Sequence, residues 1–181
     1  MDSITTYTVP SMSEELKAKL VRSCKEIKHR GKILKARKIV EYNNLGKSYY
    51  YPDGFGGEIP EDLYDYLRAG GLGEPWINEK SSVLINLYDE KGSISYHTDS
   101  IKELEEGSQI SSYSFALDSS IRYKIGTMMI KENEIIEKID IYPNHLFVWD
   151  AYEHNKRNIK HSTRQGKKAG ERLNITIRTL K

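Results

Sequence analysis

From residue 82 onward the chain is a succession of short β-prone runs separated by turn residues, and this feature limits its possible folds most. Turn signals such as Asp89 to Gly92 and Pro143-Asn144 lie between the runs. The runs are SVLINLY (82–88), SISYH (93–97), ISSYSFAL (110–117), IRYKI (121–125), TMMIK (127–131), EIIEKIDI (134–141), HLFVWDAY (145–152) and LNITIRTL (173–180). Many short strands with regular turns predict a sandwich, a barrel or a jelly roll.

Two helices are expected before these strands. Residues 11–28 place Leu16, Leu20 and Cys24 at helical spacing, and Ser11 and Glu14 have the spacing of a capping box. A second short helix is expected after Pro60. Residues 37–58, rich in Gly, Asn and Tyr, predict a hairpin and loop. The expected fold class is therefore mainly β with flanking helices (α+β).

Composition indicates one globular domain. The chain has 181 residues, of which 38% are hydrophobic and 30% are charged, and a chain of this length buries roughly 70% of its unfolded surface. The single cysteine excludes an intramolecular disulfide and a Cys-based zinc cage. No apolar run reaches the ~18 residues that span a membrane, and the first residues lack the features of a signal peptide. We expect an intracellular, cytoplasmic monomer without membrane contact, or a nuclear one if the source is eukaryotic.

Charge is divided along the chain. Residues 16–38 carry a net charge of +9 and residues 156–181 a net charge of +8, while residues 39–155 carry −12. Such asymmetry is typical either of a surface for a polyanion or of ordinary solvated Lys-rich faces. The total of +2 does not decide between them.

Two residues of the segment NLYDEKGSISYHTDS have the spacing of a metal-binding pair. His97 and Asp99 are two residues apart, so on a strand their side chains would share one face. Such a pair, joined by one distant histidine, forms the two-histidine, one-carboxylate facial triad that holds Fe(II) with open positions. The alternative is a surface pair of no function.

The C-terminal strand predicts a site for a small dicarboxylate. Polar residues alternate there with Leu173, Ile175 and Ile177, and the polar set is Arg172, Asn174, Thr176 and Arg178. Guanidiniums on an interior face need partners, and arginine binds a carboxylate as a planar fork. An exposed strand face is the alternative.

The third metal ligand must come from His29, His145, His154 or His161. His161 precedes Arg172 by eleven residues, which is enough chain to cross between neighbouring strands. We therefore favour His161 over His154.

Taken together, these motifs resemble the AlkB family of Fe(II)/2-oxoglutarate dioxygenases. The motifs are His97-x-Asp99, His161, Arg172-x-Asn174-x-Thr176-x-Arg178 and the upstream Asn86-x-Tyr88. The likeness runs from about Arg37 to Thr179. Within this range, YNNLGKSYYYP resembles the nucleotide-recognition lid of that family. It implies a double-stranded β-helix (jelly roll) core with N-terminal helices and a Tyr-rich lid hairpin. The implied divisions of a single domain, 1–181, are a helix region (11–36), a lid (37–60) and a catalytic core (80–181).

The resemblance also implies roles for individual residues. His97, Asp99 and His161 would hold Fe(II), and O2 and 2-oxoglutarate would be cosubstrates. Arg172 would pair with the distal carboxylate of 2-oxoglutarate, assisted by Tyr88 and Asn174, while Arg178 and Asn86 would hold the end that chelates iron. Tyr49, Tyr51 and Ile101 would contact the substrate. Ile101 stands where the DNA-repair members of that family usually carry an acidic residue that contacts the flipped base.

Three functions follow as hypotheses. The first is oxidative demethylation or hydroxylation of an alkylated base in single-stranded or flipped DNA or RNA, with residues 16–38 and 156–168 contacting phosphates. The second is hydroxylation of a protein side chain or a small molecule, which Ile101 and the acidic middle segment favour. The third is a jelly-roll binding module without catalytic activity.

Overall fold

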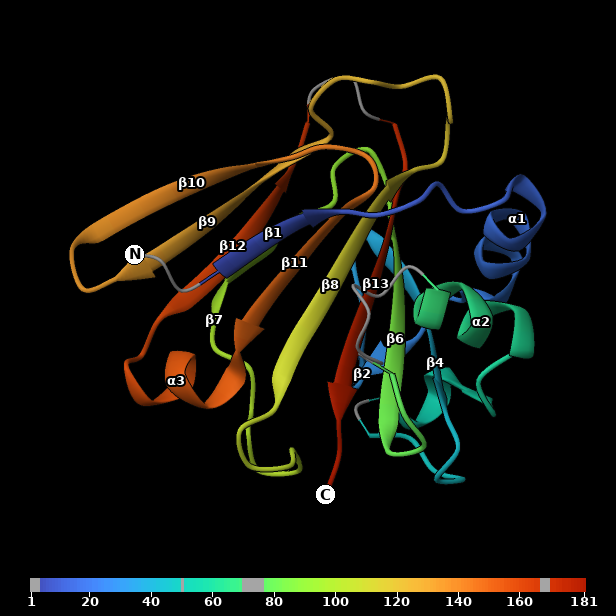
Figure 1. The fold of residues 1–181 in the computed structure, drawn as a ribbon, viewed down its shortest axis with the longest axis horizontal. Helices are drawn as coiled ribbons and strands as arrows, with labels where there is room; N and C mark the ends of the chain where they lie inside the picture. Colours follow the sequence, from blue (N-terminus) through green and yellow to red (C-terminus); the bar gives the residue numbers. More distant parts are fainter. Residues whose placement is uncertain (1–3, 50, 70–76, 167–169) are drawn as a thin grey trace.

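The computed structural model describes residues 4–49, 51–69, 77–166 and 170–181, and within them two antiparallel-rich sheets form the core. The larger sheet has the order β1-β11-β8-β13-β6-β4-β5, and the smaller sheet has the order β10-β9-β12-β7. The strands of the larger sheet are β1 (Ile4–Thr8), β4 (Arg37–Asn43), β5 (Phe55–Gly57), β6 (Ser81–Tyr88), β8 (Gln109–Ala116), β11 (His145–Asp150) and β13 (Arg172–Thr179). Those of the smaller sheet are β7 (Ile94–His97), β9 (Gly126–Glu132), β10 (Ile135–Ile141) and β12 (Lys160–Gln165). The expected jelly-roll architecture is confirmed (Figure 1).

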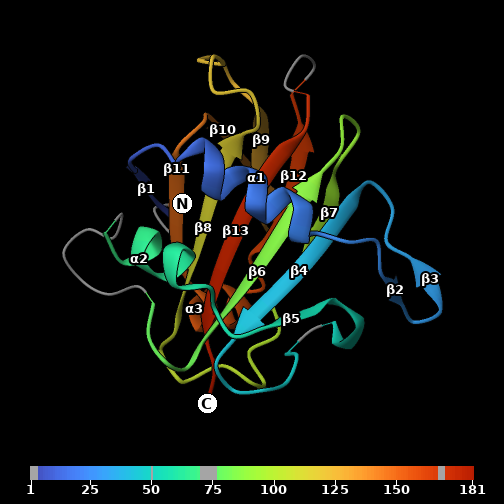
Figure 2. The ribbon, with the colours of Figure 1, turned by 90° about the vertical axis from the view of Figure 1, so that its right-hand side faces the viewer.

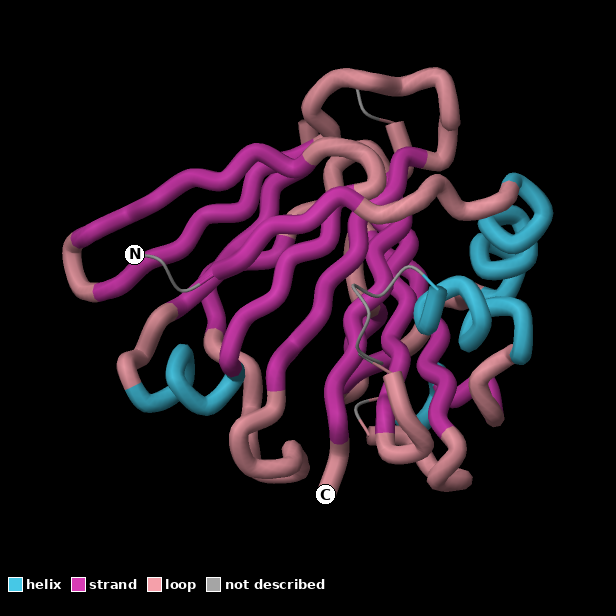
Figure 3. Tube along the Cα trace, viewed as in Figure 1, coloured by secondary structure: helices cyan, strands magenta, loops and turns pink. Residues whose placement is uncertain are grey.

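The helices α1 (Glu14–Ser23) and α2 (Glu61–Ala69) lie on one face of the larger sheet, and the smaller sheet lies on the other (Figure 2). Both helices stand in front of β13, β6 and β8 in Figure 2, with the smaller sheet behind. α3 (Ala151–Lys156) follows β11 directly. Figure 3 shows how little of the trace is helical. No helix among the described residues is long and apolar enough to cross a membrane.

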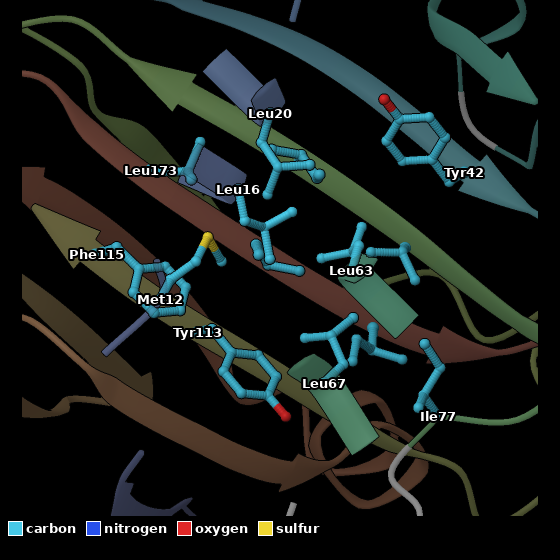
Figure 4. Close-up of a cluster of buried hydrophobic side chains, with 14 of the residues drawn as sticks. Met12, Leu16, Leu20, Tyr42, Leu63, Leu67, Ile77, Tyr113, Phe115 and Leu173 are labelled. Atoms are coloured by element: carbon cyan, nitrogen blue, oxygen red, sulfur yellow. The ribbon is translucent and has the colours of Figure 1, made fainter. Parts of the chain in front are cut away.

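Alternation along the central strands explains this division. On β13 Leu173, Ile175 and Ile177 belong to the hydrophobic cluster beneath the helices, which also contains Leu16, Leu63 and Phe115 (Figure 4). Because successive side chains of a strand point to opposite faces, the residues between them face the smaller sheet. β6 is buried along its whole length for the same reason, being covered on both faces.

The N-terminal region differs from its predicted helix. The helix begins at Glu14, capped by the side chain of Ser13, which accepts a hydrogen bond from the backbone N–H of Leu16 at 3.1 Å, so Ser11 is not the cap. It ends at Ser23 because Cys24 has extended backbone angles and Lys25 pairs with Ile39. A hairpin of β2 (Lys28–His29) and β3 (Lys32–Ile33) then occupies the rest of the expected helical region.

The expected lid of residues 37–60 is not a hairpin. β4 is an inner strand of the larger sheet, antiparallel to β6, and β5 pairs with it in parallel across the short 3-10 helix η1 (Pro52–Gly54). Together with β1, these strands extend the β core beyond the predicted 80–181. In the other direction, residues 121–125 were expected as a strand and form a connection between β8 and β9.

Candidate metal and cosubstrate site

A cavity of about 260 Å³ opens between the two sheets, and polar side chains of both sheets line it. The larger sheet contributes the row that β13 turns away from the helices, together with Asn86 and Tyr88 of β6. The smaller sheet contributes residues of β7, β9 and β12. The full lining is Arg37, Tyr51, Leu84, Asn86, Tyr88, Ile94, His97, Asp99, Ser112, Met128, Trp149, His161, Thr163, Arg172, Asn174, Thr176 and Arg178.

The three predicted metal ligands meet at one wall of this cavity. One ligand atom each from His97, Asp99 and His161 lies within 4.8 Å of the others. His97 ends β7 and pairs in register with His161 on the adjacent β12, which brings their rings to 4.3 Å between centroids. Asp99 lies two residues beyond the strand end. The local geometry is therefore a strand pair with a following carboxylate, instead of two ligands on one strand.

A hydrogen bond orients the His97 ring, and burial keeps the His161 ring neutral. Nδ1 of His97 lies 2.9 Å from the carbonyl oxygen of Ser95, and because a carbonyl only accepts, the proton is on Nδ1 and Nε2 offers its lone pair. Burial lowers the pKa of His161 to about 4. The attraction of Asp99 partly opposes this shift, and the neighbouring His97 adds to it. His161 is therefore neutral at neutral pH, which is the form that binds metals.

The carboxylate of Asp99 is ionised despite its burial. Its side chain is 5% exposed and pairs through Oδ1 with Nη2 of Arg178 at 2.8 Å. Burial works against ionisation, but Arg178, followed by His161 and His97, holds the pKa of Asp99 below its usual range. Oδ2 accepts no hydrogen bond from the described residues and lies 3.5 Å from Nε2 of His161. Two imidazoles and a carboxylate whose Oδ2 accepts no hydrogen bond from the described residues fit Fe(II).

Arg172 lies in the same cavity on the inner face of β13. It is 1% exposed, its Cζ lies 4.5 Å from the centroid of the Tyr88 ring, and its Nε donates to Oε1 of Gln165 at 3.2 Å. Nη2 is buried without a hydrogen-bond partner, and no acidic side chain of the described residues pairs with this guanidinium. Burial lowers the pKa of Arg172. A buried cation without a counter-ion fits the carboxylate of a small diacid.

The other predicted cosubstrate residues have distinct surroundings. Asn86 and Tyr88 line the cavity, as does Asn174. The amide nitrogen of Asn174 donates to Ser112 and to the backbone of Tyr113, at 2.8 Å and 2.9 Å, so it ties β13 to β8. Arg178 pairs with the carboxylate of Asp99, a predicted metal ligand. The cosubstrate roles expected for these four residues stay predictions.

The three residues expected to contact substrate are separated. Tyr51 lines the cavity, whereas Tyr49 and Ile101 are absent from its lining and pack against the hydrophobic cluster between the sheets. The Tyr49 hydroxyl donates to the carbonyl of Ser100 at 3.4 Å. Their contact with substrate also stays a prediction. His154, the alternative ligand, is buried in α3 and stacks on Trp149 outside the ligand group.

Sequence reasoning assigned no role to several residues of the cavity lining, among them Arg37 and Trp149. The charge pattern predicts Arg37 to be a surface cation, whereas its contacts with Asn86 and Tyr51 place it inside the cavity. The period-two pattern of RKIVEYN predicts only that Arg37 shares a strand face with Ile39 and Glu41, and it does not indicate that this face meets the cavity. Trp149 lies 5.1 Å from the His161 ring, and its Nε1 is buried without a partner among the described residues. No motif indicated that position.

A family comparison identifies the superfamily of the chain. Residues 7–178 match the model of the 2OG-Fe(II) oxygenase superfamily, whose members use Fe(II), 2-oxoglutarate and O2. His97, Asp99 and His161 would hold the iron, which when bound would couple the oxidative decarboxylation of 2-oxoglutarate to the oxidation of a substrate. The residues of the chain would supply the ligands, the buried cation and the enclosing walls.

A structural comparison agrees with the fold. A Pseudomonas putida prolyl-4-hydroxylase of known crystal structure matches with a TM-score of 0.60 and 12% identity, covering 99% of this chain and 93% of that one. No curated protein matches the sequence. The structural likeness shows the fold alone, whereas the family match spans nearly the whole chain. The protein therefore belongs to the 2OG-Fe(II) oxygenase superfamily.

Proposed function

We propose that this dioxygenase hydroxylates an aliphatic C–H bond of a protein side chain. The observation that carries the proposal is the size and lining of the cavity. About 260 Å³ lies below the roughly 300–1,000 Å³ of a pocket for a drug-sized ligand. With 2-oxoglutarate inside, the space that is left suits one small side chain better than a nucleobase with its sugar.

The walls support the same substrate class. Ile94, Leu84 and Met128 are the aliphatic members of the lining. Tyr51 is the one residue of the expected base clamp there, and its ring already contacts Arg37 at 5.7 Å and His29 at 5.2 Å between centres. A flipped base needs an open aromatic face on which to stack. The similar Pseudomonas putida protein is a prolyl-4-hydroxylase, so the same fold accommodates side-chain hydroxylation.

The proposed reaction is balanced by its cosubstrates. One oxygen atom of O2 enters the succinate formed from 2-oxoglutarate, carbon dioxide leaves, and the other oxygen atom enters the substrate C–H bond as a hydroxyl. Arg172 would hold the distal carboxylate, and the enclosing sheets would exclude water from the reacting centre.

Peptide turnover tests the proposal. The protein with Fe(II), 2-oxoglutarate and O2 is incubated with a peptide library, and succinate and the addition of one oxygen atom to peptides are measured by mass spectrometry. We expect peptide hydroxylation that His161→Ala abolishes. Turnover of methylated oligonucleotides, with none on any peptide, would refute the proposal.

A second candidate, oxidative demethylation of a nucleic acid, is favoured by a group of exposed cations between residues 22 and 35. Within the described ranges none of these cations forms an ion pair with another described residue. They are Arg22, Lys25, Lys28, Arg30, Lys32 and Lys35. The β2–β3 hairpin that carries three of them projects from the sheet beside β4 in Figure 2, and its His29 contacts Tyr51. The AlkB-like motifs support the same candidate.

The second basic block of the sequence, residues 156–168, supports a nucleic-acid substrate less. Arg157 forms a two-pronged ion pair with Glu132, with both N–O distances at 2.8 Å, and residues 167–168 lie outside the described residues. Binding to a labelled single strand at two salt concentrations tests this candidate, since phosphate contacts give a steep salt dependence. Lys28→Glu with Lys32→Glu would weaken binding, whereas Lys138→Glu on the distant β10 serves as the control. Salt-independent or absent binding would exclude the second candidate.

A further inference from the structure

Arg37 makes an unusual set of contacts for a residue at the start of a strand. Its Nη1 donates to Oδ1 of Asn86 at 2.7 Å, and its Nη2 donates to the hydroxyl of Tyr51 at 2.9 Å. Tyr88 lies directly beside it in the register of β4 and β6. Arg172 of β13, on the other side of β6, is the register partner of the same Tyr88. Tyr88 therefore stands between two guanidiniums that line one end of the cavity.

We infer that Arg37 is a positioning residue that turns the amide of Asn86 toward 2-oxoglutarate. A guanidinium has only donors, so the Asn86 atom that it contacts must be the carbonyl oxygen. The amide nitrogen then points away from Arg37. Asn86 is 3% exposed and lines the cavity, and within the described part of the chain its nitrogen donates no hydrogen bond. A donor is thus held ready for an oxygen of the bound diacid.

Asn174, the register partner of Asn86 on β13, has the opposite arrangement. The Oδ1 of Asn174 accepts a hydrogen bond from Thr176 at 2.9 Å, and the amide nitrogen of Asn174 donates to Ser112 and to the backbone of Tyr113. Of the two amides, Asn86 is the one whose donor stays free for a ligand. Its orientation depends on Arg37, because no other described residue contacts its oxygen by a hydrogen bond.

The second contact of Arg37 links this end of the cavity to the segment that enters η1. The Tyr51 hydroxyl and ring both face the guanidinium. A Cβ at Gly54, the last residue of η1, would lie 2.6 Å from Cδ1 of Ile39, so η1 packs closely on the strand that carries Arg37. Arg37 thereby holds the cosubstrate end and the Tyr51 wall in one arrangement.

The inference rests on 2-oxoglutarate-dependent activity and not on the substrate class proposed above, so its test uses cosubstrate binding alone. Titration calorimetry of the Mn(II)-loaded protein gives the Kd for 2-oxoglutarate without turnover. Arg37→Met should raise this Kd about tenfold, because the misoriented amide of Asn86 would lose its hydrogen bond to 2-oxoglutarate. Arg37→Lys should raise the Kd less. Lys138→Met, which removes an exposed charge on β10, should leave it unchanged.

A double-mutant cycle separates positioning from direct binding. Once Asn86→Ala has removed the amide, Arg37→Met should raise the Kd less than twofold further. A full tenfold loss in that background would mean that Arg37 acts independently of Asn86, and an unchanged Kd in the single variant would mean that it does not act at all. Either result overturns the inference. Mn(II) affinity should stay constant throughout, and if Arg37→Met does not fold, Arg37→Lys replaces it in the same cycle.

Discussion

At the scale of single residues, Arg172 is the buried side chain best suited to bind a carboxylate ligand. Its guanidinium is buried against Tyr88, and its Nη2 has no hydrogen-bond partner among the described residues. Arg172→Lys keeps the charge but loses the planar fork, so we expect 2-oxoglutarate affinity to fall about 10- to 100-fold, or roughly 1.4–2.7 kcal/mol. Calorimetry on the Mn(II) form measures it. Arg68→Lys on the exposed face of α2 is the matched control, and equal affinities of the two variants would contradict the assignment.

Cys24 gives a residue-scale prediction about stability. Burial raises the pKa of its thiol from an ordinary value of 9.0 to about 12. The unfolded chain releases this proton first, so the stabilising contribution is complete below pH 9 and is lost as pH rises toward 12. Relative to Cys24→Ala, the wild-type free energy of unfolding should fall by about 1 kcal/mol between pH 9 and pH 10. Urea unfolding measures both proteins, and parallel pH curves would contradict the expected linkage.

At the scale of elements, α3 supports the metal site from outside the sheets. Nδ2 of Asn155 donates to the backbone carbonyl of Asp99 at 3.2 Å, fixing a segment that follows β7 without strand pairing. Asn155→Ala should lower Mn(II) affinity about 2- to 10-fold, the value of one hydrogen bond. The neighbouring, exposed Lys156→Ala should not change it. Metal titration followed by tryptophan fluorescence measures both, and identical Mn(II) affinities would show that α3 does not position Asp99.

The elements that sequence pattern identified are those with strong periodicity. β13 and β6 alternate apolar and polar residues, so their faces and the Arg172 row could be predicted. β12 could not, because KHSTRQ has no apolar alternation and is held by pairing with β9 and β7. The opposite error occurred at residues 121–125, where Ile121 and Ile125 imitate a strand. There the N–H of Ile121 bonds to Asp118 in a turn instead of to a neighbouring strand.

At the scale of the whole molecule, the larger sheet separates stability from chemistry. One face of β13 and β6 packs under α1 and α2, and the other lines the cavity. A register slip of one residue would place Arg172 among the leucines below the helices, so packing of the apolar face fixes the site. The sequence could predict which residues share that row. It could not predict that Arg37 joins them, because the position of β4 in the sheet depends on long-range pairing.

Metal binding should therefore stabilise the whole fold. A cation that binds only the folded state at 100 times its Kd adds about 2.7 kcal/mol, which in a chain of this size raises Tm by about 5–10 °C. His161→Ala removes one of the three ligands that the described residues bring together, so it should abolish the rise with Mn(II) in differential scanning fluorimetry. His154→Ala empties a buried position beside Trp149, so it should lower the metal-free Tm yet keep the rise. The reverse pattern would make His154 the third ligand and would refute the site described above.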